Sequence, residues 1–168
     1  LHKEWIWFIL TQIPHHLVFI SYVGFKQEID RNEYKKRIAE GTITDVLARH
    51  EVHAGDVFYL PAGRVHAICG GILLAEVQQS SDLTYRIYDY NRPGIDGKPR
   101  ELHTELAAEA LNYHVEKDYR THYSDQKECD CTVLSTEYFS VHIIDTTAPF
   151  HRNLMEHATN GEIWSENC

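Results

Sequence analysis

Short runs of β-branched and aromatic residues, separated by glycine and proline turns, constrain this fold more than any other feature of the sequence. Strands are predicted at 5–10, 17–23, 58–60, 65–68, 72–78, 84–90, 131–134 and 138–144. Many short strands with such turns favour a mainly β chain that forms a small antiparallel β-barrel or jelly roll. The chain has 168 residues, which is enough for one such domain or slightly more.

Three segments have helical features instead. Asp30 is a predicted N-cap with Glu33 three residues later, and Gly41 ends the helix predicted over 30–40. A second short helix is predicted at 44–50 and an Ala- and Leu-rich one at 101–113. The expected organisation is a barrel over 1–95 with a helical insertion at 30–50, then a linker loop and helix over 96–113. A partial C-terminal β segment over 114–168 completes it as the beginning of a second, incomplete barrel.

Charge and apolar runs exclude several classes of partner. The formal net charge of −9 argues against binding to nucleic acid or to an anionic membrane surface. The apolar run at 5–10 is too short for a membrane span and no signal-peptide cleavage pattern follows it. The four scattered cysteines lack a framework spacing, which predicts free thiols and a cytoplasmic location; metal binding by Cys129 and Cys131 is the weaker alternative.

A pair of turns frames the most informative histidine. Gly55-Asp56 precedes the predicted strand at 58–60, Pro61-Ala62-Gly63 follows it, and the next strand carries His66. This is the turn pattern of a cupin-type barrel, and it projects His66 to one face of its strand. From the residues alone, His66 is either a barrel histidine satisfied by hydrogen bonds or a metal ligand.

The stretch that follows resembles a known enzyme family. AEVQQSSDLTYRIYDYNR at 75–92, GKPRELHTELA at 97–107 and YVGFK at 22–26 resemble the type I mannose-6-phosphate isomerases in their short bacterial form. The resemblance covers about residues 3 to 112. It implies a zinc-dependent aldose–ketose isomerase of the cupin superfamily, which interconverts mannose 6-phosphate and fructose 6-phosphate through a cis-enediol. A sugar phosphate is therefore the implied partner and Zn²⁺ the implied cofactor.

The resemblance also implies residue roles. His66 matches a zinc ligand of the family, and Glu76 matches an active-site carboxylate suited to moving a proton between C1 and C2. Arg86 matches a positive group that serves the substrate, through its phosphate or its developing oxyanion charge. Lys98 is expected to add to a phosphate-facing rim, together with Arg100 and His103.

Each of these roles has a plainer alternative. Glu76 could be a solvated or salt-bridged strand residue, and Arg86 could pair with Asp82 or Asp89. The GKP sequence around Lys98 is also simply a turn.

The start of the chain departs from the family pattern. The family has a Lys-x-Glu element whose glutamate binds zinc, where this chain has Lys3-Glu4-Trp5. Aligned on Lys3, Glu4 is the candidate ligand; aligned on Trp7, Trp5 takes its place, and a one-residue slip reverses the face. The upstream metal-binding element of the family is also missing. We therefore expect a chain truncated at both ends that binds zinc weakly and isomerises poorly.

Two other functions are alternatives for a cupin-type chain. One is a non-catalytic cupin fragment that binds sugar phosphate or metal weakly. The other is a metal-dependent cupin oxygenase, which the sequence disfavours because such enzymes use a two-His-one-carboxylate set and no H-x-H pair occurs in the chain.

Overall fold

Two compact units make up the chain, Leu1–Arg120 and Thr121–Cys168. The computed structural model describes residues 4–12, 19–79, 84–89 and 97–149. Within these ranges the elements are mainly strands, and every strand pairing is antiparallel. The helices of the described ranges are too short or too polar to cross a membrane.

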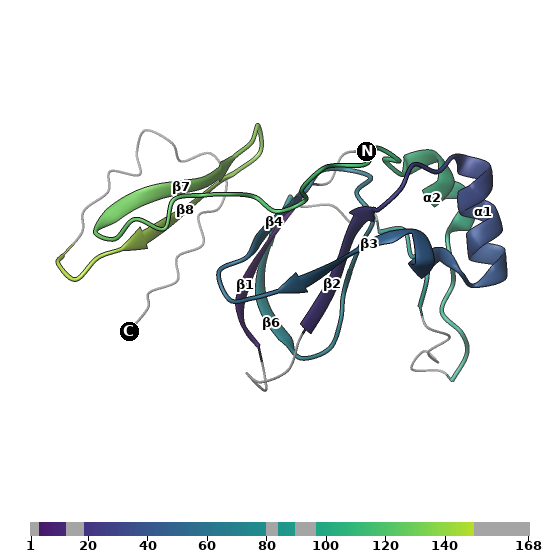
Figure 1. Cartoon of the computed structure of the whole chain (residues 1–168), viewed down its shortest axis with the longest axis horizontal. Coiled ribbons are helices and arrows are strands. Elements are labelled where there is room, and N and C mark those ends of the chain that lie inside the picture. The colour runs from purple at the N-terminus through teal and green to yellow at the C-terminus, as the bar shows by residue number, and fades with distance from the viewer. Residues whose placement is uncertain (1–3, 13–18, 80–83, 90–96, 150–168) are drawn as a thin grey trace. The chain divides into compact units, whose positions relative to one another are not determined.

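The first sheet of the first unit is built around the earliest strand. β1 (Trp5–Gln12) lies in the centre, between β4 (Val57–Leu60) and β6 (Ile72–Gln78). Its run of aromatic and branched residues, WIWFIL, suits a strand, and Ile6, Trp7 and Ile9 are buried. Figure 1 shows β1 and β6 running side by side along the sheet.

The second sheet has the same three-stranded form. β2 (Phe19–Phe25) lies between β3 (Leu47–Val52) and β5 (His66–Ile68). The register pairs Val23 with His66 on one side and Ser21 with His50 on the other. Since directly opposite residues of an antiparallel pair point to the same face, both histidines share the face of the buried Val23 and Ser21.

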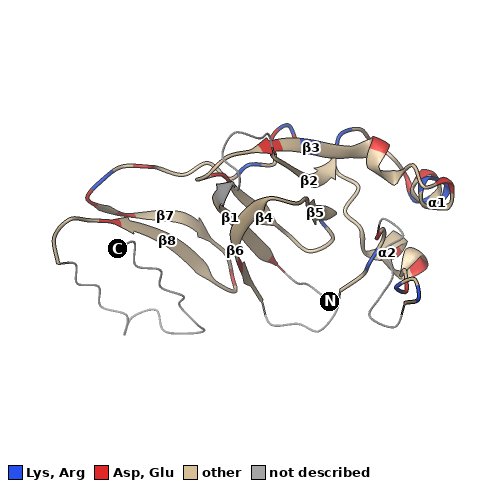
Figure 2. Ribbon diagram, turned by 90° about the horizontal axis from the view of Figure 1, so that it is seen from below, with Lys and Arg blue, Asp and Glu red and all other residues tan. Residues whose placement is uncertain are grey.

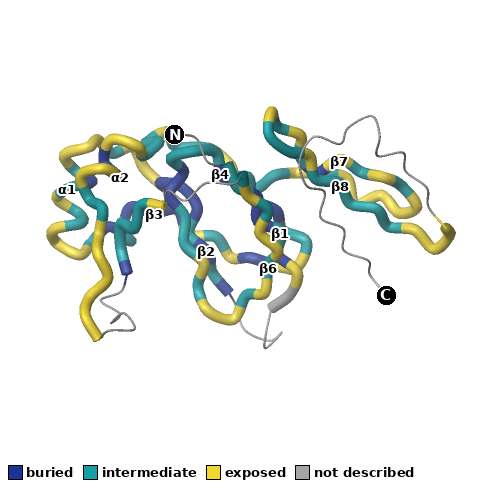
Figure 3. Tube along the Cα trace, turned by 180° about the vertical axis from the view of Figure 1, so that it is seen from behind, coloured by how far each residue is buried: buried dark blue, intermediate teal, exposed yellow. Residues whose placement is uncertain are grey.

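A first core forms between the two sheets. It contains buried side chains from β1, β2, β3 and β4 and one tyrosine that follows the last helix: Trp7, Ile9, Phe19, Val23, Ala48, Val52, Phe58, Leu60 and Tyr119. Figure 3 shows this burial concentrated in the strands of the first unit. The face of each sheet that contributes to this core is called the inner face below.

The helices enclose a second core. α1 (Arg31–Glu40) begins at the N-cap Asp30, whose Oδ1 accepts from Glu33 N at 2.8 Å, and ends at Gly41 with φ +71°. α2 (Thr104–Ala110) packs against it. The buried members of this core come from β2, α1, β3, α2 and the intervening loops: Phe25, Tyr34, Ile43, Val46, Leu47, Val65, Ala107 and Ala108. Charged residues of both signs cover the exposed side of α1 (Figure 2).

The described part of the second unit is a β-hairpin. β7 (Cys129–Ser135) pairs with β8 (Ser140–Asp145), and Val133 is its buried residue. Ser135 Oγ lies 2.9 Å from Ser140 Oγ at the turn end of the ladder.

The predicted helix caps at Asp30 and Gly41 are confirmed, while three predicted elements are wrong in extent or type. The helix expected at 44–50 is a 3₁₀ turn, η1 (Ile43–Val46), followed by β3, because pairing with β2 buries Ala48 and Val52 in the first core. The predicted helix at 101–113 shortens to α2.

The strand expected at 84–90 does not form over 84–89, where Tyr85, Ile87 and Tyr88 instead pack against the second core. Residues 17–18, residue 90, the loop at 91–96 and the tail from 150 onward lie outside the described residues.

Candidate functional site

The PAG turn positions His66. Arg64 N donates to Pro61 O at 3.0 Å, and Gly63 has φ +81°, a left-handed conformation that glycine adopts without strain. The turn therefore ends β4 and starts β5, where pairing with Val23 places His66 on the inner face. The sequence had predicted that this turn projects His66 to one face of its strand.

A backbone carbonyl fixes the His66 ring. His66 Nδ1 lies 2.7 Å from Arg64 O, and because a carbonyl oxygen only accepts, Nδ1 carries a proton and donates to it. Metal-binding histidines are commonly held in this way, with one ring nitrogen donating to a carbonyl. The ring also contacts Trp5 and Trp7 edge-on, with centroid distances of 4.5 and 5.0 Å.

Glu76 lies directly opposite Trp7 in the sheet. The register of β1 and β6 pairs the two residues, so both side chains lie on the inner face. Trp7 Nε1 donates to Glu76 Oε2 at 2.8 Å, from an indole that is only 1% exposed. One buried tryptophan therefore contacts both the histidine and the carboxylate singled out from the sequence.

Glu4 lies outside this arrangement. Gln79 N donates to Glu4 O at 3.0 Å, which continues the β1–β6 pairing by one residue. Because side chains alternate along a strand, Glu4 falls on the face opposite to Trp5, and Trp5 takes the position next to His66. Glu4 Oε2 is buried and has no hydrogen-bond partner among the described residues.

Arg86 is held by a neighbouring segment. Arg86 N donates to His103 Nδ1 at 3.1 Å, His103 N donates to Arg86 O at 2.8 Å, and Arg86 Nη1 donates to Glu101 O at 3.4 Å. Residues 84–89 and 101–103 are thus bonded side by side. Neither a hydrogen bond nor an ion pair joins Arg86 to Glu76 within the ranges that the structure describes.

The alternative partner of Arg86 is taken by another residue. Arg100 forms a two-point ion pair with Asp89, whose side chain is 7% exposed. Asp82, the other alternative, lies outside the described residues. Lys98 is exposed and follows Gly97 in the turn. Asp89 thus neutralises Arg100, while Arg86 is held by residues 101–103.

The sequence argument missed two features of the interior. Trp5 and Trp7 line the site, and their spacing of two on a strand was the available signal for a shared face. The other feature is His50, whose Nε2 lies 3.1 Å from Val23 O and whose ring contacts Phe58 and Tyr119. Burial lowers the pKa of His50, so the neutral imidazole is favoured.

The described residues do not complete a metal site. A catalytic zinc ion normally takes three protein ligands. No group of three or more His, Cys, Asp or Glu side chains within the described ranges is arranged to hold an ion. His66 has the ring anchoring of a ligand, and its ring contacts Trp5 and Trp7 among the described residues.

The expectation of free thiols is wrong at two positions. Cys129 and Cys131 are joined by a disulfide, which the loose spacing of the four cysteines did not suggest. Cys69 is a free thiol whose pKa is raised by burial. Cys168 lies outside the described residues, and the cytoplasmic location stays a prediction.

Comparison with known proteins identifies the relatives of this chain. No family model matches it. It is 41% identical over 113 residues to the mannose-6-phosphate isomerase ManA of Bacillus subtilis, across 66% of this chain and 36% of that protein. It is 37% identical over 143 residues to the mannose-6-phosphate isomerase of Streptococcus mutans, across 84% of this chain and 44% of that protein. The chain thus spans less than half the length of these relatives.

A solved structure agrees with the sequence matches. The crystal structure of the mannose 6-phosphate isomerase from Bacillus subtilis superimposes with a TM-score of 0.72 at 34% identity, covering 83% of this chain and 44% of that one. This likeness confirms the predicted fold class, a mainly β, cupin-type antiparallel barrel with inserted and appended helices. By sequence and by fold, the chain belongs to the mannose-6-phosphate isomerase family.

Proposed function

We propose that this chain provides the sugar-phosphate barrel of an aldose–ketose isomerase acting on mannose 6-phosphate and fructose 6-phosphate. The observation that carries the proposal is the contact of one buried indole, Trp7, with both Glu76 and His66 on the inner face. The named activities of the relatives support the choice of substrate.

Glu76 is the proposed proton carrier. Isomerisation removes the proton from C2 of the aldose and returns it to C1 of the enediol, which one carboxylate on one face of the sugar can do. The Trp7 N–H holds Oε2, and this fixes the direction from which the carboxylate approaches the substrate. Because Glu76 is an exposed residue of β6, substrate can reach it.

Arg86 and Lys98 are the proposed phosphate contacts. A guanidinium carries five N–H donors. In the guanidinium of Arg86, Nη1 donates to Glu101 O, which is its one acceptor among the described residues. The two backbone bonds with His103 hold Arg86 in place, which limits the ordering that phosphate binding would require. Lys98 lies in the neighbouring turn and adds a second positive charge.

Zinc is the proposed cofactor, and His66 is its proposed ligand because a backbone carbonyl anchors its ring. Glu4, the second ligand expected from the sequence, lies on the opposite face of β1 and does not join His66. The described residues do not make a three-ligand set, so His66 alone is proposed as a ligand.

Deuterium exchange tests the proposal directly. Mannose 6-phosphate in D₂O should lose its C2 proton signal when the protein is added, and Glu76→Gln should slow this by about 10²–10⁴-fold. Glu40→Gln, at the exposed end of α1, is the matched control and should exchange at the rate of the unsubstituted chain. Equal rates for the two variants would remove Glu76 from the role.

The alternative function is a non-catalytic cupin fragment that binds sugar phosphate. Its specific support is that Glu4 lies on the face of β1 opposite to Trp5, whereas His66 contacts Trp5, so the two expected zinc ligands lie apart. Saturable shifts of the sugar phosphorus resonance without proton exchange, lost in Arg86→Ala, would establish binding without isomerisation.

A further inference from the structure

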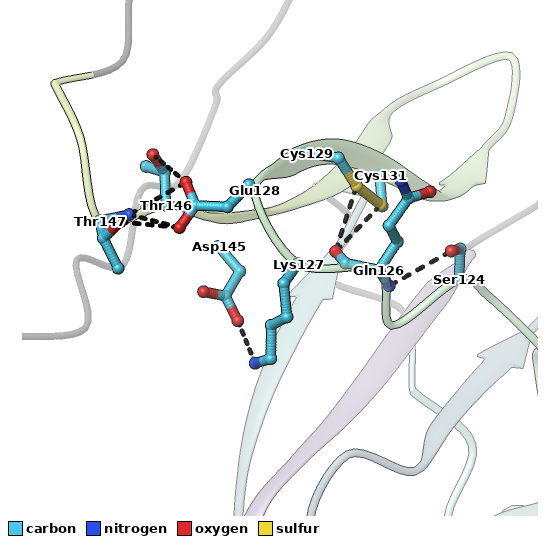
Figure 4. Close-up of polar contacts among 9 residues, drawn as sticks. All are labelled: Ser124, Gln126, Lys127, Glu128, Cys129, Cys131, Asp145, Thr146 and Thr147. Atoms are coloured by element: carbon cyan, nitrogen blue, oxygen red, sulfur yellow. Dashed lines mark hydrogen bonds and ion pairs between the residues drawn. A yellow bond between two sulfur atoms is a disulfide. The ribbon is translucent and has the colours of Figure 1, made fainter.

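The second unit carries a pair of cysteines that the isomerase chemistry does not use. Cys129 and Cys131 are two residues apart on β7, so both side chains lie on one face of the strand. A disulfide joins them, with Asp130 between them in the sequence. Figure 4 shows both sulfurs next to the carbonyl oxygen of Gln126, at 3.2 and 3.7 Å.

The surrounding contacts hold the hairpin without help from this bond. Lys127 pairs with Asp145 across the strands. Glu128 accepts hydrogen bonds from Thr146 Oγ1 at 3.2 Å and from Thr147 Oγ1 at 2.8 Å (Figure 4). A cross-link within one strand closes a very short loop, and short loops give the least stabilisation. The disulfide is therefore a weak structural restraint.

The segment before β7 fixes the position of the Gln126 carbonyl. Gln126 N donates to Ser124 Oγ at 3.3 Å, and the Glu128 carboxylate is held by two threonines. Glu128 has φ +55°, a strained conformation for a residue other than glycine, and these contacts maintain it. A carbonyl oxygen held beside two sulfurs is a ready acceptor for their S–H groups after reduction. The site thus accommodates the dithiol as well as the disulfide.

The pair is also within reach of solution. Both cysteines are partly exposed, and Lys127 beside them has a side chain that is 79% exposed. Cys69, by contrast, is a single free thiol in the first unit, with a pKa raised by burial.

We propose that Cys129 and Cys131 form a reversible thiol–disulfide exchange site for low-molecular-weight thiols. A thiolate of the small molecule attacks one sulfur, the S–S bond breaks, and the other cysteine leaves as a thiolate. A second small thiolate then attacks the small-molecule sulfur of the mixed disulfide and releases the first cysteine. Two electrons pass to the protein, two cysteines take up protons, and one small-molecule disulfide is the product.

Equilibration with reduced and oxidised glutathione tests this site. The experiment uses the 168-residue chain with Cys69→Ser and Cys168→Ser, so that Cys129 and Cys131 are its two cysteines. Free thiols are trapped by alkylation, and the products are identified by mass spectrometry. A single two-electron transition between the disulfide and the dithiol is expected across the glutathione series. A disulfide that stays closed at every ratio, or thiols that never oxidise, would overturn the proposal.

A second readout separates exchange from a structural bond. Because other contacts hold the hairpin, proteolysis within 121–149 should change by less than about threefold on reduction, since local opening governs cleavage. A larger change would show that the disulfide is a structural restraint. Added to the Cys69→Ser, Cys168→Ser chain, Cys129→Ser should leave Cys131 as a single thiol that forms a stable mixed disulfide with glutathione. Absence of this adduct would contradict the access of small thiols to Cys131.

Discussion

Substitution of Gly63 by alanine probes the turn that delivers His66. Gly63 has φ +81°, and a Cβ at this position would lie 2.3 Å from Ala110 O and 3.0 Å from Asn112 N. Ala110 O belongs to the last residue of α2 and Asn112 N to the backbone just after it, and Asn112 N already donates to Gly63 O at 2.9 Å. No side-chain rotation relieves such a contact, so the turn or the end of α2 must move.

The expected cost has two parts. Placing a residue with a Cβ in the left-handed region costs about 1–2 kcal/mol. Forcing a methyl group into a packed site costs a further amount of about 1–3 kcal/mol. Gly63→Ala should therefore lower the free energy of unfolding by about 2–5 kcal/mol, a large part of the roughly 5–15 kcal/mol typical of a domain.

Gly41→Ala is the matched control for the first part. Gly41 has φ +71°, but nothing lies within 4 Å of a Cβ built there. It should lose only the backbone cost of about 1–2 kcal/mol. Urea unfolding followed by tryptophan fluorescence measures both variants, and their difference isolates the contact with the segment after α2. Equal losses in the two variants would refute the close approach of Gly63 to that segment.

Three further substitutions test the interior and the helix cap. Because burial lowers the pKa of His50, the unfolded chain binds the proton more readily than the folded chain. The urea midpoint should therefore fall as pH drops below about 6.5, the ordinary pKa of histidine, and His50→Gln should flatten this slope. Tyr119→Phe removes an O–H that donates to Phe25 O at 2.7 Å, and calorimetry should show a loss of about 1–2 kcal/mol. Asp30→Ala removes the acceptor for Glu33 N, and urea unfolding should show a loss of about 1 kcal/mol; no loss would exclude the cap.

Local patterns predicted the parts of the fold that local geometry determines. The cap at Asp30, the stop at Gly41 and the turn before His66 were all predicted correctly, because each depends on a few consecutive residues. The same holds for the strand around Trp7, whose run of aromatic and β-branched residues is visible in the sequence.

Tertiary packing determines the elements that local patterns predicted wrongly. Residues 47–52 form a strand because they pair with β2. Tyr85 and Ile87 pack against the second core and do not pair with a neighbouring strand. The indole bond to Glu76 also depended on register across 69 residues, which no local pattern records. Among the candidate site residues, the sequence predicted that His66 projects to one face of its strand and left the face of Glu4 undecided; the roles of His66 and Glu76 stay predictions.

The central place of β1 in its sheet has a consequence for how the chain folds. Trp5 pairs with Leu60 on one side and with Gln78 on the other, so both partners come much later in the sequence. Such non-local pairing folds in about milliseconds to seconds, whereas the β7–β8 hairpin can form in about 1–10 μs. Until β4 and β6 have both paired with β1, the run WIWFIL keeps at least one unpaired edge, and an exposed segment of this type associates with copies of itself. Refolding yield should therefore fall steeply as protein concentration rises.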